Sequence, residues 1–246
     1  MDKPLASRIA LITGASRGIG HAVARALARD GVHIVAVART VGGLEELDDI
    51  IKQDGGTATL VPLDLADLDG LARLGAALNE RYGKLDVMVG NAGVLGPASP
   101  LGHIEPKQWT DVMAINVTAN FQLIRCMEPL LRNSDAGRAV FISSGAASNA
   151  RAYIGPYSAS KAALEILVRT WAAEVATTPI RANLFNPGPI RTRMRASLMP
   201  GEDPMTLDTP EQVAEFVVPM CLPSWTENGK LYNYPSRSLL NFRPPA

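Results

Sequence analysis

Three side chains between residues 144 and 161 could together protonate the oxygen of a carbonyl group. Tyr157 and Lys161 are four residues apart, so they lie on one face if the segment is helical. A free phenol has a pKa of about 10, and a neighbouring ammonium group favours the phenolate and lowers that pKa. Ser144 lies thirteen residues before the tyrosine, and its hydroxyl could hold the same oxygen. The set predicts acid–base chemistry on a carbonyl or an alcohol, provided that another group delivers hydride.

A Tyr-x-x-x-Lys pair by itself is weak evidence, because surface helices often carry one. The N-terminal part of the chain adds a site for a hydride carrier. The apolar run Arg8–Thr13 predicts a buried strand, and the glycine-rich segment Gly14–Gly20 leads from it into a predicted helix over His21–Arg29. Glycines between a strand and a helix let a pyrophosphate approach the free N–H groups at the helix N-terminus. This context predicts a dinucleotide site.

Strand and helix patterns alternate along the rest of the chain. Further strands are expected at His33–Ala38, Ala58–Pro62, Leu85–Gly90, Ala139–Ser143, Arg181–Phe185 and Leu231–Tyr234. Helices are expected at Gly42–Gln53, Leu68–Arg81, Gln108–Leu131, Tyr157–Ala176 and Pro210–Cys221. Such alternation predicts a parallel sheet covered by helices on both faces. The sequence shows no linker or repeat, so residues 1–246 are expected to form a single domain.

Charge and composition narrow the class of protein. The 246 residues suffice for one sizeable core, and 24 acidic residues balance 24 basic ones, which argues against nucleic acid or a membrane surface as the partner. Cys126 and Cys221 are too few for a disulfide framework or a metal site, so we expect two core thiols. No apolar run reaches the ~18 residues of a membrane span, and no signal peptide precedes the first strand. We therefore expect a cytoplasmic enzyme.

The glycine spacing Gly-x-x-x-Gly-x-Gly, together with Ser144, Tyr157 and Lys161, resembles the short-chain dehydrogenase/reductase family. Three further motifs agree with this resemblance, and all of them arrive in family order between about Ser7 and Gly229: Asn91-Ala92-Gly93, Asn116 within Ala114-Ile115-Asn116-Val117, and Asn186-Pro187-Gly188-Pro189-Ile190-Arg191-Thr192. The resemblance implies a Rossmann-type, doubly wound, seven-stranded parallel sheet of order 3-2-1-4-5-6-7. It also implies hydride transfer between a nicotinamide cofactor and a carbonyl or secondary alcohol.

The resemblance also assigns roles to particular residues. Tyr157 would protonate the carbonyl oxygen, Ser144 would hold that oxygen, and Lys161 would lower the pKa of the tyrosine and bind the nicotinamide ribose. Asn116 would belong to a water relay behind Lys161, and Ser143 is set aside because the thirteen-residue spacing matches Ser144. The residues expected to bind the cofactor are Gly14, Ser16, Arg17, Gly18, Ile19, Gly20, Arg39, Asp64, Leu65, Asn91, Ala92, Gly93, Tyr157, Lys161, Pro187, Gly188, Ile190 and Thr192. No metal is expected.

The second strand indicates which nicotinamide cofactor is used. NAD sites usually place an acid near the end of this strand to bind the ribose 2′-hydroxyl. Here the strand ends Val37-Ala38-Arg39-Thr40, and Arg17 in the glycine loop could reach the same point. A guanidinium suits a 2′-phosphate, although both arginines could instead be ordinary surface charges. We therefore expect NADP(H), with NAD(H) as the alternative. Asp64 resembles the acid that contacts adenine in the family, and Asn91 is expected to brace the sheet centre.

Residues 191–210 are expected to form a mobile lid over the nicotinamide pocket, because prolines and a glycine interrupt the segment. Its methionines and Leu198 offer apolar surface to a substrate. Arg193 and Arg195 could meet an anionic substrate or face solvent, and we favour solvent. The chain ends differently from many family members, because Lys230–Ser236 lacks paired glycines. The C-terminal edge is therefore expected to be rearranged.

The predicted helix Tyr157–Ala176 is apolar on nearly all sides, which predicts burial on both faces. One face can meet the sheet, and the other needs a partner. We expect a homodimer or homotetramer formed through this helix and the one at Gln108–Leu131, the common arrangement in the family.

Three functions remain open at this point. The first is an NADP-dependent oxidoreductase acting on a small-molecule carbonyl or alcohol. The second is a 3-oxoacyl-thioester reductase, for which an apolar lid is suitable. The third, of another class, is a regulator that binds NADP without turnover. The intact set Ser144, Tyr157 and Lys161 disfavours the regulator, since a protein without catalysis has little need for all three.

Overall fold

The computed structural model describes residues 5–242, which form one sheet of eight described strands in the order β3-β2-β1-β4-β5-β6-β7-β8. The strands are β1 (Ile9–Thr13), β2 (His33–Ala38), β3 (Thr57–Pro62), β4 (Val87–Gly90), β5 (Arg138–Ile142), β6 (Arg181–Asn186), β7 (Leu231–Asn233) and β8 (Ser238–Leu240). The first seven are parallel in the predicted order, which confirms the expected topology. The eighth pairs antiparallel with β7 and was not predicted.

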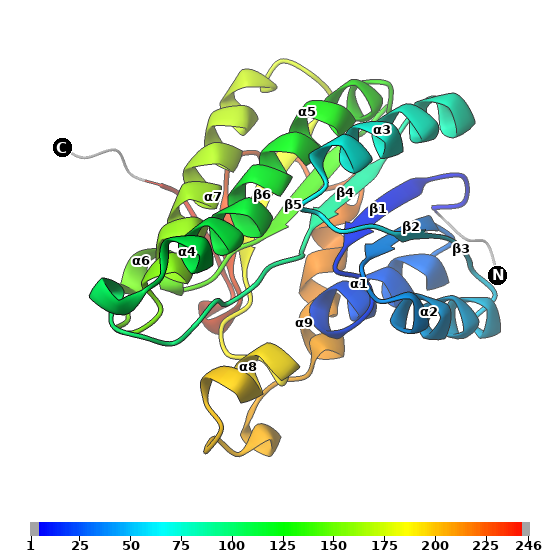
Figure 1. Cartoon of the computed structure of the whole chain (residues 1–246). Coiled ribbons are helices and arrows are strands. Elements are labelled where there is room, and N and C mark those ends of the chain that lie inside the picture. Colours follow the sequence, from blue (N-terminus) through cyan, green and yellow to red (C-terminus); the bar gives the residue numbers. More distant parts are fainter. Residues whose placement is uncertain (1–4, 243–246) are drawn as a thin grey trace.

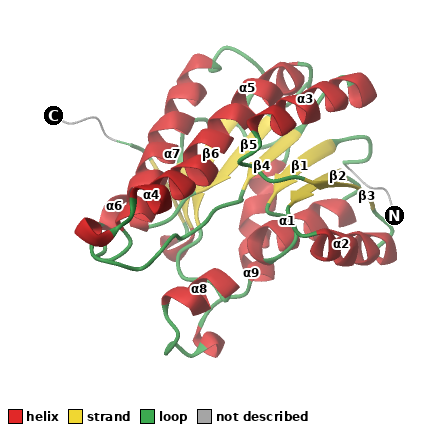
Figure 2. Cartoon of the chain, viewed as in Figure 1, coloured by secondary structure: helices red, strands yellow, loops and turns green. Residues whose placement is uncertain are grey.

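Helices cover both faces of the sheet, as Figures 1 and 2 show. One layer holds α1 (Gly18–Arg29), α2 (Val41–Gln53) and α9 (Pro210–Val217). The other holds α3 (Leu68–Tyr82), α5 (Ala119–Arg132) and α7 (Gly155–Glu174). Shorter helices follow the strand ends: α4 (Pro106–Met113), α6 (Ala146–Asn149) and α8 (Arg193–Leu198), the last of which lies outside both layers in Figure 1.

The central strands are buried on both faces, and their side chains alternate between two apolar cores. In β1, Ala10 and Ile12 pack into the core beneath α1, whereas Ile9 and Leu11 pack into the core beneath α5 and α7. This alternation follows from the two-residue period of a strand. Because β1, β4, β5 and β6 run parallel, their carboxyl ends lie at one edge of the sheet, where the loops to the following helices begin.

The segment expected to be one helix over Gln108–Leu131 changes its winding in the middle. It begins at Pro106, where Glu105 and Gln108 form a reciprocal capping box. A π-helical turn at Ala114–Thr118 separates α4 from α5. A π turn widens the helix by one residue and is often found at functional sites. Asn116 lies in this turn and is fully buried.

Residues 191–210, the segment expected to form the lid, are not an irregular loop. The segment contains α8 and a short 3-10 turn at Pro204–Thr206, and it returns to α9 through Asp208. After β7 the chain makes another 3-10 turn at Tyr234–Ser236 before β8. Within the described part of the chain, no helix is both long and apolar enough to cross a bilayer, and no cluster of side chains is suited to a metal ion.

Candidate active site

Ser144 and Tyr157 meet at the carboxyl end of β5. Ser144 follows the strand by two residues, and Tyr157 lies in the first turn of α7. The Ser144 hydroxyl lies close enough to the Tyr157 phenol to influence its pKa, and Tyr157 is only 9% exposed. Burial raises the pKa of the Tyr157 phenol, and the Ser144 hydroxyl opposes this in part. The phenol is therefore held as an acid, because a low-dielectric environment disfavours the phenolate.

Lys161 lies one turn after Tyr157 and points toward the same strand end. Its ammonium donates a 2.7 Å hydrogen bond to the carbonyl oxygen of Ile142 and lies 5.8 Å from the centre of the Tyr157 ring. Burial lowers the pKa of Lys161 to about 8, although Glu165 opposes the shift. Lys161 was expected to lower the pKa of Tyr157. In the structure, burial is the largest influence on the pKa of the phenol, and the Lys161 ammonium donates its hydrogen bond to the backbone instead.

Ser143 has a different environment from its neighbour. Its hydroxyl donates a 2.6 Å hydrogen bond to Glu165 Oε1, and its backbone N–H donates to the carbonyl of Phe185 at 2.7 Å. Ser143 is 2% exposed, and its hydroxyl is already committed to the carboxylate. This placement agrees with setting Ser143 aside in favour of Ser144. It also brings in Glu165, which the sequence analysis did not single out although it lies four residues after Lys161.

Asn116 holds the chain after β4 against α7. Its amide oxygen accepts from the N–H of Val94 at 2.8 Å, and its amide nitrogen donates to the Val94 carbonyl and to Ser160 Oγ, both at 2.9 Å. Ser160 in turn donates to the Tyr157 carbonyl at 2.7 Å. The structure thus joins Asn116 to α7 through Ser160, which no sequence pattern singled out. The water relay through Asn116 stays a prediction.

The glycine loop is packed too tightly for any side chain at two of its glycines. A Cβ at Gly14 would lie 2.8 Å from the Asn91 amide nitrogen, and one at Gly20 would lie 2.4 Å from the same atom. The Asn91 side chain fills this space, and its amide nitrogen donates to the carbonyl oxygens of Thr13 and Gly14, at 2.8 and 3.3 Å. These contacts agree with the bracing role expected of Asn91 at the centre of the sheet, and its contact with the cofactor stays a prediction. They bring the chain after β4 directly against the turn after β1.

The charged residues expected to choose the cofactor lie at the ends of β2 and β3. Arg39 and Asp64 face each other, with 3.7 Å between Nη1 and Oδ2, and both are substantially exposed. Arg17 is exposed at the N-cap of α1, where no side chain caps the free N–H groups. Leu65 is buried beside Asp64. The N-terminus of α1 and the two arginines thus remain accessible to an anionic ligand.

The turn after β6 links the glycine loop to the lid. Gly188 has φ of +69°, a left-handed conformation that favours glycine, and its N–H donates to Asn186 Oδ1 at 3.1 Å. Thr192 caps the first turn of α8 by accepting from the N–H of Arg195. A Cβ at Gly18 would lie 3.6 Å from Thr192 Cγ2, so the start of the lid lies over the N-terminus of α1.

Apolar side chains gather around Tyr157 to form walls of a site. Ala146 and Ile154 are buried against the tyrosine, and Leu95 and Leu198 pack onto them. The chain after β4, the loop before α7 and residues 191–210 thus all contribute apolar surface around the tyrosine. Other residues of these segments do not take part, since Tyr153 and Met205 are 63% and 73% exposed.

The expectation that Arg195 faces solvent is wrong. Its guanidinium makes a two-pronged ion pair with Glu202, with distances of 2.6 and 2.5 Å. Both partners belong to the lid, so the ion pair joins two parts of the same segment. It raises the pKa of Arg195 and lowers the pKa of Glu202. Arg193, by contrast, is exposed as expected.

Comparisons with known proteins agree with this geometry. The family model for short chain dehydrogenases matches residues 8–203. The uncharacterised oxidoreductase YciK of Escherichia coli K12 is 38% identical over 212 residues, which cover 85% of this chain and 84% of YciK. The 2,3-dihydro-2,3-dihydroxybenzoate dehydrogenase of Bacillus subtilis is 33% identical over 82% of this chain and 77% of its own length.

Solved structures show the same similarity. A short chain dehydrogenase of Shigella flexneri 2a, crystallised with NADP, has a TM-score of 0.91 and 36% identity over 96% of this chain and all of its own. A short chain dehydrogenase of Escherichia coli CFT073, crystallised with NADPH, has a TM-score of 0.88 and 35% identity over 95% of this chain and 99% of its own. With its sheet order, its Ser-Tyr-Lys arrangement and these relatives, the chain belongs to the short-chain dehydrogenase/reductase family of NAD(P)-dependent oxidoreductases.

Proposed function

We propose that this protein reduces a carbonyl compound with NADPH, and that Tyr157 donates the proton. The observation that carries the proposal is the placement of the Ser144 hydroxyl beside the Tyr157 phenol, with the buried ammonium of Lys161 5.8 Å from the centre of the tyrosine ring. Burial keeps this phenol protonated, so Tyr157 can supply the proton that the carbonyl oxygen takes up during reduction.

The residues that are present fit a nicotinamide dinucleotide. The pyrophosphate would meet the N-terminus of α1, where no side chain caps the free N–H groups. Beside the catalytic helix, Gly93 leaves space next to Lys161, because a Cβ there would lie 3.6 Å from the ammonium nitrogen. Gly188, Ile190 and Thr192 would border the nicotinamide end. The bound cofactor would supply the hydride.

Each catalytic side chain then has a defined task. Ser144 holds the substrate oxygen next to the phenol, and Tyr157 transfers its proton to that oxygen. Lys161 compensates the negative charge that forms on the tyrosine and donates a hydrogen bond to the cofactor ribose. Asn116 holds the start of the catalytic helix through Ser160 and completes a path for water that returns the proton.

Two features favour NADPH over NADH. The end of β2 offers Arg39 instead of an acid, and Arg17 lies exposed at the start of α1. Guanidinium groups bind a phosphate strongly through charge-assisted hydrogen bonds. The relatives crystallised with NADP and NADPH support the same choice. We expect NADH to be accepted less well.

The substrate would carry an apolar group next to its carbonyl. The walls around Tyr157 are aliphatic, and Arg195 of the lid is already paired with Glu202. Both features favour an apolar group over an acidic one next to the carbonyl. A 3-oxoacyl thioester would also present an apolar chain, so it belongs among the test compounds.

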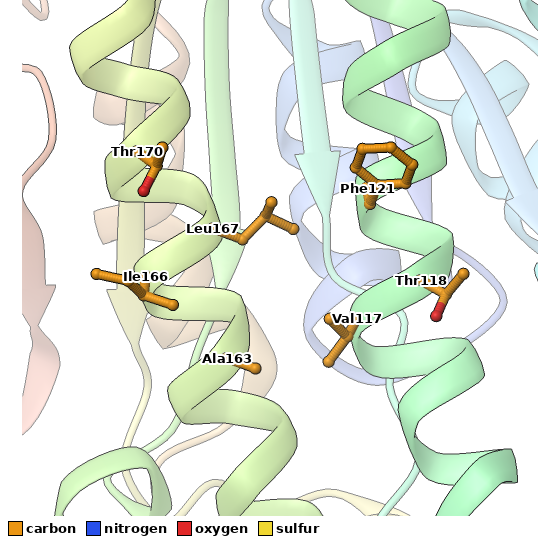
Figure 3. A pocket seen from close by; sticks show the side chains of 7 residues that line it. All are labelled: Val117, Thr118, Phe121, Ala163, Ile166, Leu167 and Thr170. Atoms are coloured by element: carbon orange, nitrogen blue, oxygen red, sulfur yellow. The ribbon is translucent and has the colours of Figure 1, made fainter.

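The protein would work as a homo-oligomer. An apolar groove lies between α5 with its preceding π turn and α7, where Phe121 and Ile166 are 49% and 56% exposed (Figure 3). The outer face of α7 is thus left without a partner in a single chain, and a second copy packing its own α5 and α7 there would bury it. We place the protein in the cytoplasm, where its two free cysteines would stay reduced.

The test is oxidation of NADPH, with NADH in parallel, against ketones, quinones, aldehydes and 3-oxoacyl thioesters. The proposal expects turnover with NADPH on at least one of these classes, and slower turnover with NADH. Tight NADPH binding without turnover on any class would favour a regulator instead. Failure to bind either cofactor would overturn the proposal.

A further inference from the structure

The turn between β7 and β8 contacts both the loop after β6 and the far end of the lid. We call residues 233–237 the C-terminal turn. It begins at the last residue of β7, makes one 3-10 turn at Tyr234–Ser236, and reverses at Arg237, which has φ of +50°. Asn233 lies beside Asn186 in the parallel register of β6 and β7. The C-terminal turn therefore lies at the carboxyl edge of the sheet, where the active site is built.

One set of contacts reaches the turn after β6. Asn186 donates a 2.7 Å hydrogen bond to Asn233 Oδ1 and uses its own oxygen to accept from the N–H of Gly188. Pro235 lies against Gly188 so closely that a Cβ there would be 2.6 Å from the proline Cγ. The left-handed conformation of Gly188 is thus enclosed by the C-terminal turn on one side and Asn186 on the other.

A second set reaches the far end of the lid. The hydroxyl of Tyr234 donates a 2.8 Å hydrogen bond to Asp208 Oδ2, and the tyrosine is 4% exposed. Arg237 lies 3.4 Å above the Tyr234 ring, and its Nη2 is 3.7 Å from the same carboxylate oxygen. Asp208 therefore receives both a hydrogen bond and a positive charge from the C-terminal turn.

Asp208 also joins the two ends of the lid. Its carbonyl oxygen accepts from the N–H of Arg191 at 2.9 Å, and it forms a parallel bridge with Ile190. The lid thus leaves and re-enters the body of the protein at one point. Because the Tyr234 hydroxyl holds that point, a single hydrogen bond connects the C-terminal turn to the base of the whole lid.

We propose that Tyr234 is a positioning residue that, through Asp208, holds the base of the lid and the Gly188 turn in the conformation that binds NADPH. The proposal rests on the proposed function, because the Gly188 turn and the lid matter only if they border the cofactor. It assigns a role to the part of the chain that departs from the family pattern. Tyr234 acts on the cofactor only through the residues that it holds.

The test compares Tyr234→Phe with Tyr232→Phe. Tyr232 stands two residues earlier and stacks on Phe185, but its hydroxyl makes no hydrogen bond within residues 5–242. Each variant removes one oxygen from the same aromatic cluster, and only the first removes a hydrogen bond to Asp208. The readouts are the Kd for NADPH from cofactor fluorescence and the rate at which trypsin cuts the lid at Arg191, Arg193 and Arg195, measured with and without NADPH.

For Tyr234→Phe we expect the Kd for NADPH to rise about fivefold to tenfold, because the binding-competent conformation becomes less populated. We also expect faster cutting of the lid without cofactor and weaker protection by NADPH, whereas Tyr232→Phe behaves as the wild type. Asp208→Ala should have the same effect, and the double variant should be no worse than either single one.

Identical behaviour of the two tyrosine variants in both readouts would overturn the proposal, and so would effects of Tyr234→Phe and Asp208→Ala that simply add. A wild type that binds no NADPH would overturn the proposed function instead. In that case the trypsin comparison without cofactor still decides whether Tyr234 holds the lid.

Discussion

The Ser143 hydroxyl and the Glu165 carboxylate form a 2.6 Å hydrogen bond that ties the strand end carrying Ser144 to the helix carrying Tyr157. One turn earlier on the same helix, Lys161 binds the carbonyl of Ile142. Tyr157, Lys161 and Glu165 follow at intervals of four residues and so share one face of α7. Two successive turns of α7 are therefore hydrogen-bonded to the end of β5. These two hydrogen bonds fix the position of Ser144 relative to the Tyr157 phenol.

Glu165 should set the pH range of the enzyme. Its negative charge raises the pKa of Lys161 and so opposes burial, and the balance of the two leaves that pKa at about 8. The rate of reduction, expressed as kcat/KM for NADPH, reports the free enzyme and should fall as pH rises through that value, because Lys161 loses its charge. In Glu165→Gln the hydrogen bond from Ser143 can persist while the charge is gone, so the fall should move to lower pH.

The control is Glu174→Gln, which removes an exposed carboxylate near the end of the same helix. Its pH profile should match the wild type. Superimposable profiles for Glu165→Gln and the wild type would contradict the assigned coupling between Glu165 and Lys161.

Ser160→Ala should destabilise the fold and weaken catalysis together. The serine is fully buried, and its loss leaves one N–H of the Asn116 amide without an acceptor. An unpaired buried donor costs about 1–3 kcal/mol. We expect urea unfolding to show a loss of that size, together with a lower kcat. Ser158→Ala is the matched control, since the Ser158 hydroxyl is buried without a partner and its removal should be neutral. Equal stability of both variants would contradict the role of Ser160.

Arg39→Ala should lower the affinity for NADPH much more than the affinity for NADH. Loss of the guanidinium removes a phosphate ligand and leaves Asp64 facing the 2′-phosphate unpaired. Charge-assisted hydrogen bonds of this kind correspond to about a tenfold to hundredfold loss of NADPH affinity, with little change for NADH. Titration calorimetry with both cofactors checks this, with Arg73→Ala as a control on the exposed face of α3. A parallel loss for NADPH and NADH would show that Arg39 does not read the phosphate.

Phe121→Asp and Ile166→Asp should dissociate the oligomer. Both side chains border the apolar groove between α5 and α7, and burying a carboxylate there is unfavourable (Figure 3). Sedimentation analysis should give a dimer or tetramer for the wild type and monomers for the variants. Leu101→Asp, at a position that is 65% exposed away from the groove, should leave the assembly intact. A monomeric wild type at micromolar concentration would remove the need for a partner on this face.

Most of the fold could be predicted from the sequence because its signals are local. Alternating apolar strands and helices predict seven strands, and the resemblance to the short-chain dehydrogenase/reductase family implies their order. The eighth strand could not be predicted, since Ser238–Leu240 is only three residues long and owes its conformation to pairing with β7. The π turn at Asn116 was missed because one extra residue in a helix leaves the apolar pattern nearly unchanged.

The site shows the same division. Ser144, Tyr157 and Lys161 could be identified from type and spacing, but their hydrogen bonds depend on distant residues. Ser160 meets Asn116 across 44 positions, and Ser143 meets Glu165 across 22. Arg195 pairs with Glu202 across a bend in the lid that no helical period indicates. Sequence reasoning placed that arginine in solvent because nothing local gave it a partner.

The most direct measurement compares wild type and Tyr157→Phe for NADPH binding and for NADPH-dependent reduction of the best substrate class. The ring of Tyr157 packs against Ile154 and Ala146, so the variant should fold and bind NADPH with an affinity close to the wild type. Its kcat should fall at least about a hundredfold, as expected when a general acid is removed. Full activity of Tyr157→Phe with the same substrate would show that the proton comes from elsewhere and would contradict the account.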